Sequence, residues 1–180
     1  MLEVLINRMI RAARLDVNLY EEVEADESAT SQALLVVVIC SLAGGIGAGL
    51  AALILGTAGF GGLVWGLIFG AIWAIIGWLI WSFLSYWIGT NFFQGTATYS
   101  EMLRAIGFAY SPQAISIFAF IPCLGLLLVL AALIWSLVAV VIAVRQALDF
   151  TTGRAIATSL AGWVIMIIVQ AVLRLLVGAY

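Results

Sequence analysis

Long apolar runs separated by short polar stretches make up most of the chain after residue 31. The runs cover about residues 32–56, 62–88, 99–120, 122–148 and 154–176. A membrane-spanning helix needs about 20 predominantly apolar residues, so each run predicts one transmembrane helix. We therefore predict an all-α integral membrane protein in which five transmembrane helices form a single domain over residues 32–180.

The first 31 residues follow a different pattern. Leu5, Met9 and Leu19 recur near helical spacing over residues 1–20, and the arginines bunch on the other side. This predicts an amphipathic helix, which either lies in the headgroup region or packs on the inner face of the protein. Residues 21–31 carry five of the nine acidic residues and are typical of a solvated linker. Residues 1–31 are thus predicted as a cytoplasmic amphipathic helix and an acidic linker.

Glycines at every fourth position mark the first two predicted spans. Gly45 and Gly49 share one helix face, and Gly62, Gly66 and Gly70 form a ladder in the next span. Small residues at this spacing let helix backbones approach closely in a membrane. We expect the ladder to meet the first predicted span or another glycine face directly, backbone to backbone.

The run from Asn91 to Pro112 is the most polar part of the helical body. Thr98 and Glu101 have the spacing of a capping box, which predicts a helix start. Pro112 lacks a backbone N–H and should kink that helix inside the membrane. The residues around the kink predict a polar path into the membrane, formed by Tyr99, Tyr110, Ser111, Pro112 and Gln113.

Five charged residues fall at the inner ends of the third, fourth and fifth predicted spans. One interpretation is a set of interfacial ion pairs that ties the loops together, and this is the one we favour. The other is a vestibule that admits an anion or a lipid headgroup. The cluster consists of Glu101, Arg104, Arg145, Asp149 and Arg154.

The arginines also predict the orientation in the membrane. Six of the seven basic residues lie in the N-terminal region and in the loops before the third and fifth spans, whereas the other two loops are uncharged. Because cytoplasmic loops are enriched in Arg and Lys, we expect a cytoplasmic N-terminus and a C-terminus on the opposite side of the cell (inner) membrane. Arg174 is the exception, near the far end of the last span.

Composition narrows the function classes. The chain is 66% hydrophobic and 9% charged, with a mean hydropathy of +1.24, whereas soluble proteins carry about 25% charged residues. A net charge of −2 argues against nucleic acid as a partner. The chain has no histidine, which removes the usual metal ligand and proton shuttle. Glu101 and Asp149 are the only candidates for a catalytic carboxylate pair, and neighbouring arginines would keep both ionised. We expect no enzyme activity, no catalytic residue, no metal and no cofactor.

Three stretches resemble a known family. They are LYEEVEADESATSQALLVV before the first span, YSEMLRAIGFAYSPQAI into the third and AVRQALDFTTGRAIAT into the fifth. They are similar to the prokaryotic branch of the Yip-domain membrane family, whose eukaryotic members are named for interaction with Ypt/Rab GTPases. The resemblance implies five spans, a cytoplasmic N-terminus and a non-enzymatic role in membrane organisation or trafficking. Eukaryotic members have a longer N-terminal region, so no Rab-binding residue is transferred to this chain.

These observations favour a scaffold or interaction protein of the Yip type. Its expected partners are membrane lipids and either a second copy of the chain or another membrane protein. The alternative is a small ion or solute channel or transporter, entered through the vestibule lined by Arg104, Arg145 and Arg154. An intramembrane enzyme that acts on lipid ranks last.

Overall fold

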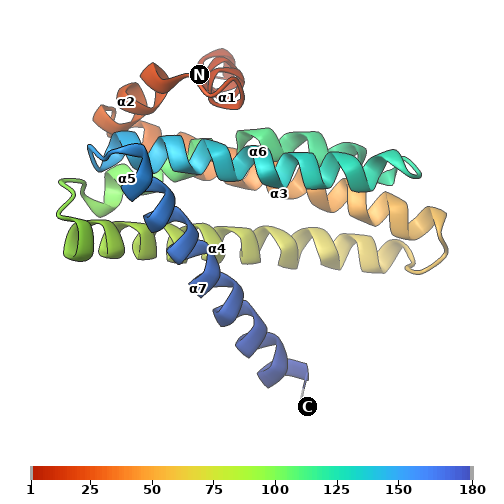
Figure 1. The fold of residues 1–180 in the computed structure, drawn as a ribbon. Coiled ribbons are helices and arrows are strands. Elements are labelled where there is room, and N and C mark those ends of the chain that lie inside the picture. The colour runs from red at the N-terminus through yellow and green to blue at the C-terminus, as the bar shows by residue number, and fades with distance from the viewer. Residues whose placement is uncertain (1, 179–180) are drawn as a thin grey trace.

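Helices account for nearly all of the ordered structure (Figure 1). The computed structural model describes residues 2–178, except the side chains of residues 170 and 173–178. Arg174, the exception in the predicted distribution of arginines, has its side chain outside the described part of the structure. The elements in chain order are α1 (Leu2–Ala13), α2 (Val17–Ala25), α3 (Ala29–Ile54), α4 (Phe60–Phe93), α5 (Tyr99–Ala109), the 3₁₀ helix η1 (Ser111–Phe120), α6 (Leu124–Ala147) and α7 (Thr152–Gly178).

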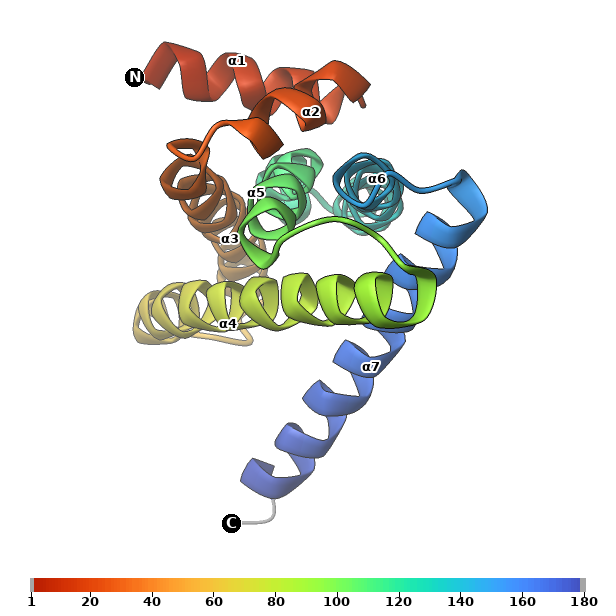
Figure 2. The ribbon, with the colours of Figure 1, turned by 90° about the vertical axis from the view of Figure 1, so that its left-hand side faces the viewer.

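Four of the described helices, α3, α4, α6 and α7, are long and apolar enough to cross a membrane. Together with the Yip-like sequence pattern, these apolar helices mark the chain as a membrane protein. α3, α4 and α6 run alongside one another, while α7 crosses α4 and leaves the bundle diagonally (Figure 1). α5 lies at the centre when the bundle is viewed from one end, with α3 and α6 on its two sides (Figure 2). We call this the polar end, because α2, the start of α5 and the α6–α7 link meet there.

The segment predicted as one kinked helix over residues 99–120 is two helices, and this differs from the expected single span. The break follows from Pro112, which has no N–H to donate to the carbonyl of Phe108. The hydroxyl of Ser111 donates to that carbonyl instead, at 2.7 Å. The chain continues from there as η1, which packs between α3 and α6.

Only part of the glycine prediction holds within the chain. Gly45 and Gly49 pack against the side chains of Leu67 and Leu63 on α4. The ladder of Gly62, Gly66 and Gly70 does not behave as predicted: a Cβ at Gly66 or Gly70 would meet nothing within 4 Å, and one at Gly62 would touch only nearby Ala58. This part of α4 extends along the bundle with its glycine face uncovered, so the spacing alone did not identify the packed side.

A closer glycine contact lies on α3. A Cβ at Gly47 would collide with the carbonyl oxygens of Ser116 and Ile117. The absent side chain lets the η1 backbone lie directly against α3, which is the close approach that small residues permit in membrane helices.

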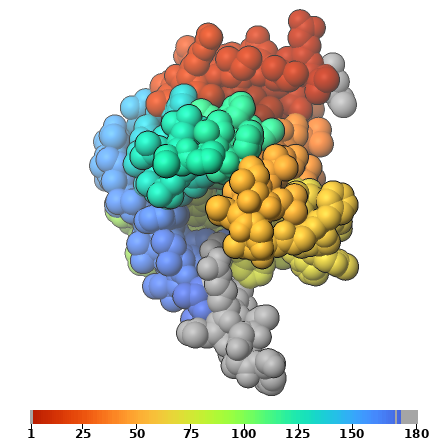
Figure 3. All heavy atoms as spheres, turned by 90° about the vertical axis from the view of Figure 1, so that its right-hand side faces the viewer, coloured from red at the N-terminus to blue at the C-terminus, as the bar shows by residue number. Residues whose placement is uncertain are grey.

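The region predicted as a linker is largely helical. Leu19, Tyr20 and Val23 of α2 are completely buried, so the acidic residues sit on a helix that packs against α5 and α6. α1 ends at Ala13 and lies across the flank of the bundle, above α6 and α3 in Figure 3. α1 therefore packs on the protein, while other residues of the same helix remain exposed.

Candidate interaction site at the polar end

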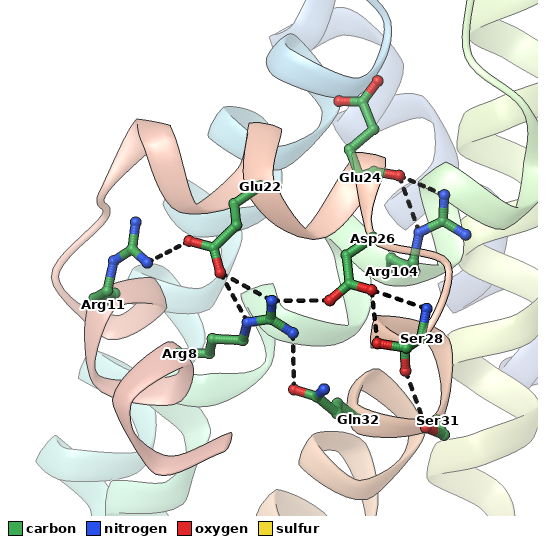
Figure 4. A network of polar contacts seen from close by, with 9 residues as sticks. All are labelled: Arg8, Arg11, Glu22, Glu24, Asp26, Ser28, Ser31, Gln32 and Arg104. Carbon is green, nitrogen blue, oxygen red and sulfur yellow. Dashed lines mark hydrogen bonds and ion pairs between the residues drawn. The ribbon is translucent and has the colours of Figure 1, made fainter. Parts of the chain in front are cut away.

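Arg8 connects three helical segments at the polar end. Its guanidinium donates to Glu22 Oε1 at 3.0 Å, to Asp26 Oδ2 at 2.9 Å and to Gln32 Oε1 at 3.0 Å (Figure 4). The three acceptors belong to α2, the α2–α3 link and α3. The planar fork of an arginine suits this task because it presents several donors in a fixed geometry. Arg8 thus ties α1 to the start of the first long helix.

Arg11 extends the same network toward the turn after α1. It donates to Asp16 Oδ2 at 2.8 Å and to Glu22 Oε2 at 2.5 Å. These bonds lower the pKa of both carboxyl groups, Asp16 and Glu22, below their ordinary values. The pKa of Asp26 is also lowered, first by hydrogen bonding from Ser28 and then by Arg8. All three groups therefore remain ionised at neutral pH.

Arg104 binds main chain and not a carboxylate. Its side chain donates twice to the carbonyl oxygen of Glu24, with Nε at 3.1 Å (Figure 4). Its Nη1 also donates to Thr30 Oγ1 at 3.4 Å. Glu24 lies in the last turn of α2, where carbonyls lack helical partners and a positive charge is favoured. Arg104 is only 5% exposed, so it acts as a buried cap that holds α2 on α5.

A recess of about 400 Å³ lies beside this cap and is acidic. It is lined by the carboxylates of Glu21, Glu24, Glu101 and Asp149, with Gln146 donating to Glu21 Oε1 at 2.7 Å. Burial, followed by repulsion from Glu101 and Asp149, raises the pKa of Glu24 to about 7. The site is thus negative at neutral pH, with one carboxyl group close to its titration point.

Only part of the predicted five-residue charge cluster forms: Glu101 and Asp149 line the recess and Arg104 lies beside it, but no ion pair among the described residues joins any of the five to another. Arg104 binds α2, Arg145 donates to Gln146, and Arg154 is exposed. Asp149 accepts from Thr96 at 3.2 Å, whereas Glu101 completes the predicted capping box with Thr98. All ion pairs among the described residues involve Arg8 or Arg11. The favoured interpretation of interfacial ion pairs is therefore wrong in its residues, because the N-terminal helices supply the partners.

The predicted polar path is also divided. Tyr99 donates to the carbonyl of Leu79 at 3.1 Å, and Ser111 is buried with its hydroxyl bound one turn back. Pro112 is buried at the start of η1. Of the five predicted residues, only Tyr110 and Gln113 line a cavity, which lies between α4, α6 and α7.

The polar end thus combines an acidic recess with a network of ion pairs. No three His, Cys, Asp or Glu side chains in this part of the chain are placed to hold a metal ion. Arg8, Glu22 and Glu24 were not among the predicted site residues. The available signal was the complementary charge of residues 8–14 and 21–27, where three arginines precede five acids.

Comparison with known proteins decides the family. The family model of the Yip1 domain matches residues 18–173, which is most of the chain. The protein belongs to the Yip1 domain family. The match begins within α2 and therefore includes the acidic recess, Arg104, all of α3, α4 and α6, and α7 as far as residue 173. No curated protein and no solved structure matches the chain.

Proposed function

We propose that this Yip1-domain protein is a non-enzymatic, multi-pass membrane protein that organises membranes or acts in trafficking through lipid or protein partners. The observation that carries the proposal is the exposed apolar arc of α1. Leu2, Ile6 and Ile10 are between 47% and 67% exposed, although Arg8 fixes the same helix to the protein. A rigidly held apolar arc at the flank of a bundle suits contact with lipid or with another membrane protein.

A fifth crossing is part of this proposal. α5 has 11 residues and η1 has ten. At about 1.5 Å per α-helical residue and 2.0 Å per 3₁₀ residue, the pair extends roughly 36 Å along its axes. The hydrocarbon core is about 30 Å thick. The pair is long enough to cross, and its contacts with α3 and α6 support a place among the other spans.

The same arrangement supports an orientation in the membrane. The start of α5, the end of α6 and the start of α7, which carry Arg104, Arg145 and Arg154, meet at the polar end, and α1 with Arg8 lies on the flank next to α2 (Figure 1). Enrichment of arginine on the inner side of the membrane favours a cytoplasmic polar end. With five crossings, the C-terminus lies on the opposite side of the cell membrane, and α1 lies in the plane of the inner leaflet.

The test uses the full chain reconstituted into vesicles that contain anionic lipid. We expect the protein to change vesicle size or clustering without raising ion leak above that of empty vesicles. Ile6→Glu combined with Ile10→Glu should weaken the effect, because both changes charge the apolar arc. Asn7→Glu is the matched control, since Asn7 is an exposed polar residue on the same helix. Unchanged vesicles together with an ion flux that Arg104→Ala abolishes would overturn the proposal.

The channel alternative has less support. It requires Arg104, Arg145 and Arg154 to line one entrance. Arg104 instead binds the carbonyl of Glu24 in α2, and the recess is lined by carboxylates. Glu101 and Asp149 likewise make structural hydrogen bonds, which weakens the case for a lipid-modifying enzyme.

A further inference from the structure

α1 runs crosswise to the long helices on the flank of the bundle. In Figure 1 α6 extends across the view and α1 is seen nearly end-on, whereas in Figure 2 α6 is end-on and α1 extends across the view. α6 is one of the helices that are long and apolar enough to cross a membrane. A helix laid across it therefore lies along the plane of that membrane.

The contacts of α1 place it where the bundle changes from polar to apolar. Arg8 binds the side chain of Gln32 on α3 at 3.0 Å, and α3 contains no charged or amide residue from there to Ile54. α1 also packs against both α5 and η1. It thus lies level with the first apolar turns of the long helices, which is the level at which the headgroups of a bilayer adjoin its acyl chains.

The inner and upper faces of α1 have fixed neighbours. Leu5 and Ala12 are buried against the bundle. Arg8 and Arg11 both bind the carboxylate of Glu22 on α2, and α2 lies nearer the polar end than α1 does (Figure 1). These contacts fix the rotation of α1 about its own axis.

This rotation directs the apolar arc away from the polar end. Successive residues of an α-helix are rotated by roughly 100°, so Ile6, in the middle of the arc, lies roughly 150° around the helix from both Arg8 and Arg11. Since the two arginines face α2, the arc faces the apolar level of the bundle. Leu2, Ile6 and Ile10 remain between 47% and 67% exposed there, so the described part of the chain leaves them largely uncovered.

The exposed side of α1 offers little net charge to a membrane. Arg8 and Arg11 each form two ion pairs with carboxylates. Of the other charges in this segment, Arg14 and Glu3 are exposed, have opposite signs and form no ion pair with a described residue. Helices that are attracted to anionic lipid carry an excess of Lys and Arg on the polar face. Attraction between charges therefore contributes little here.

The arc is also small for a protein interface. It is a single stripe of three side chains, whereas each partner in a stable protein complex buries about 800 Å². Lipid requires no such area, because acyl chains can surround each side chain separately. An interfacial helix buries its apolar face about 5–10 Å into the boundary between headgroups and acyl chains, which matches the level and the direction of the arc.

We propose that α1 is an interfacial anchor whose arc lies among the acyl chains of the leaflet at the polar end, and that it inserts by apolar burial and not by attraction to anionic lipid. The anchor rests on the proposed function, in which the arc meets lipid or another membrane protein, and lipid is the partner that the geometry favours. The ion pairs of Arg8 and Arg11 hold α1 in the rotation that aims the arc into the leaflet.

The experiment measures the depth of α1 in lipid nanodiscs that each hold one copy of the full-length protein. Nitroxide labels are attached to Ile6→Cys, Ile10→Cys and Asn7→Cys in a Cys123→Ser background. The unlabelled parent is the blank, because its remaining Cys40 is buried. Electron paramagnetic resonance compares the collisions of each label with oxygen, which concentrates among acyl chains, and with a water-soluble nickel complex. Asn7 is the matched control, since it is exposed on the same helix next to Ile6.

Labels at Ile6 and Ile10 should lie about 5–10 Å below the headgroups, with collisions with oxygen favoured. The label at Asn7 should lie at the level of the headgroups, with collisions with the nickel complex favoured. The depths should be the same in discs of phosphatidylcholine alone and in discs that also contain phosphatidylglycerol. All three positions are exposed, so the labels leave the buried contacts of α1 intact.

Three results would overturn the proposal. Collisions with the nickel complex favoured at all three positions would place α1 in water above the bilayer. Labels at Ile6 and Ile10 that are shielded only in discs holding two copies would assign the arc to contact between chains. Insertion that appears only with phosphatidylglycerol would show that charge drives it.

The anchor and the proposed function can fail separately. Single-copy discs report contact with lipid without any vesicle clustering. Labels in water together with altered vesicles would overturn the anchor and leave the proposed function with a protein partner. Inserted labels together with unchanged vesicles would support the anchor and count against the proposed function alone.

Discussion

Replacing Arg8 by methionine should release α1 and α2 from the bundle while the long helices stay folded. Methionine keeps the apolar stem and removes the three hydrogen bonds to Glu22, Asp26 and Gln32. Hydrogen bonds that involve a charged group contribute about 1.5–3 kcal/mol each when buried. The Glu22 and Asp26 side chains are 41% and 32% exposed, so water replaces much of what they lose. We therefore expect a total cost of about 2–3 kcal/mol.

Hydrogen–deuterium exchange in lipid nanodiscs measures this cost directly. A loss of about 2–3 kcal/mol raises local opening of α1 and α2 about 30- to 150-fold, since each 1.4 kcal/mol corresponds to a factor of ten. Arg14→Met removes the same charge from an exposed arginine that makes no hydrogen bond or ion pair to a described residue, and should change exchange less than threefold. Similar exchange protection of α1 and α2 in the two variants would refute the reasoning, because the network would then contribute nothing to holding these helices.

Acid should loosen the same contact in the unmodified protein. The pKa values of Glu22 and Asp26 lie below their ordinary values of 4.5 and 3.8. Groups whose pKa is lowered by folding stabilise the protein above the unfolded pKa, and that stabilisation is lost as pH falls through the folded value. Exchange of α1 should therefore rise below about pH 4 in the wild type. In Arg8→Met this acid response should be smaller, because one source of the lowered pKa values is gone.

Three further substitutions test other parts of the structure. Glu24→Gln should stabilise α2 at pH 8 and have little effect at pH 4. The pKa of Glu24 is raised to about 7 in the folded protein, so the wild type loses stability as pH rises from 4.5 to about 7. Equal hydrogen exchange of α2 in the two proteins at pH 8 would contradict this. Gly47→Val should lower the free energy of unfolding by about 1–3 kcal/mol or more. Gly66→Val should change it by no more than about 0.5 kcal/mol. Equal unfolding temperatures of the two variants in a thermal melt would contradict this. Trp78→Phe should cost about 1 kcal/mol more than Trp81→Phe, because only Trp78 loses a hydrogen bond, the one from its indole to the carbonyl of Leu103. An equal loss in the two variants would refute the distinction between the two indoles.

The long helices could be predicted from the sequence because hydrophobic length is a local property. The predicted run 32–56 corresponds to α3 (Ala29–Ile54), and the capping box at Thr98 is confirmed. Pro112 was expected to disturb its helix, and it does so by a change to 3₁₀ geometry that depends on the hydroxyl of Ser111. The division into α5 and η1 leaves four single helices long enough to span a membrane.

The polar end was harder to predict because its contacts join distant residues. Arg104 binds the carbonyl of Glu24, 80 positions earlier, and a main-chain acceptor leaves no trace in the side-chain pattern. The acidic stretch looked like a solvated linker because its charges outnumber its apolar residues. Leu19, Tyr20 and Val23 nevertheless fall on one helix face and are fully buried, and this spacing was the available signal.

Helical spacing also cannot tell which small or aromatic residues face a neighbour. The ladder through Gly66 has a regular period and meets nothing, whereas Gly47 meets the η1 backbone. The difference arises because η1 packs between α3 and α6. This is tertiary packing, which the spacing of residues within one helix does not reveal. Trp78 and Trp81 lie three residues apart on α4, and only the first reaches a carbonyl.

The distribution of unpaired polar groups indicates where binding partners are needed. At the polar end, Arg8 and Arg104 have protein acceptors, and any remaining polar atoms there can be satisfied by water. In the middle of a membrane span water is absent, so an unpaired donor must find an acceptor on the protein, on a lipid or on another chain. Among the described residues, six such groups are buried without a partner, on Trp81, Ser82, Ser85, Ser136, Thr158 and Ser159. The charged end of the protein thus holds its N-terminal helices in place with paired charges, whereas the uncharged interior keeps its unpaired polar groups enclosed by packing.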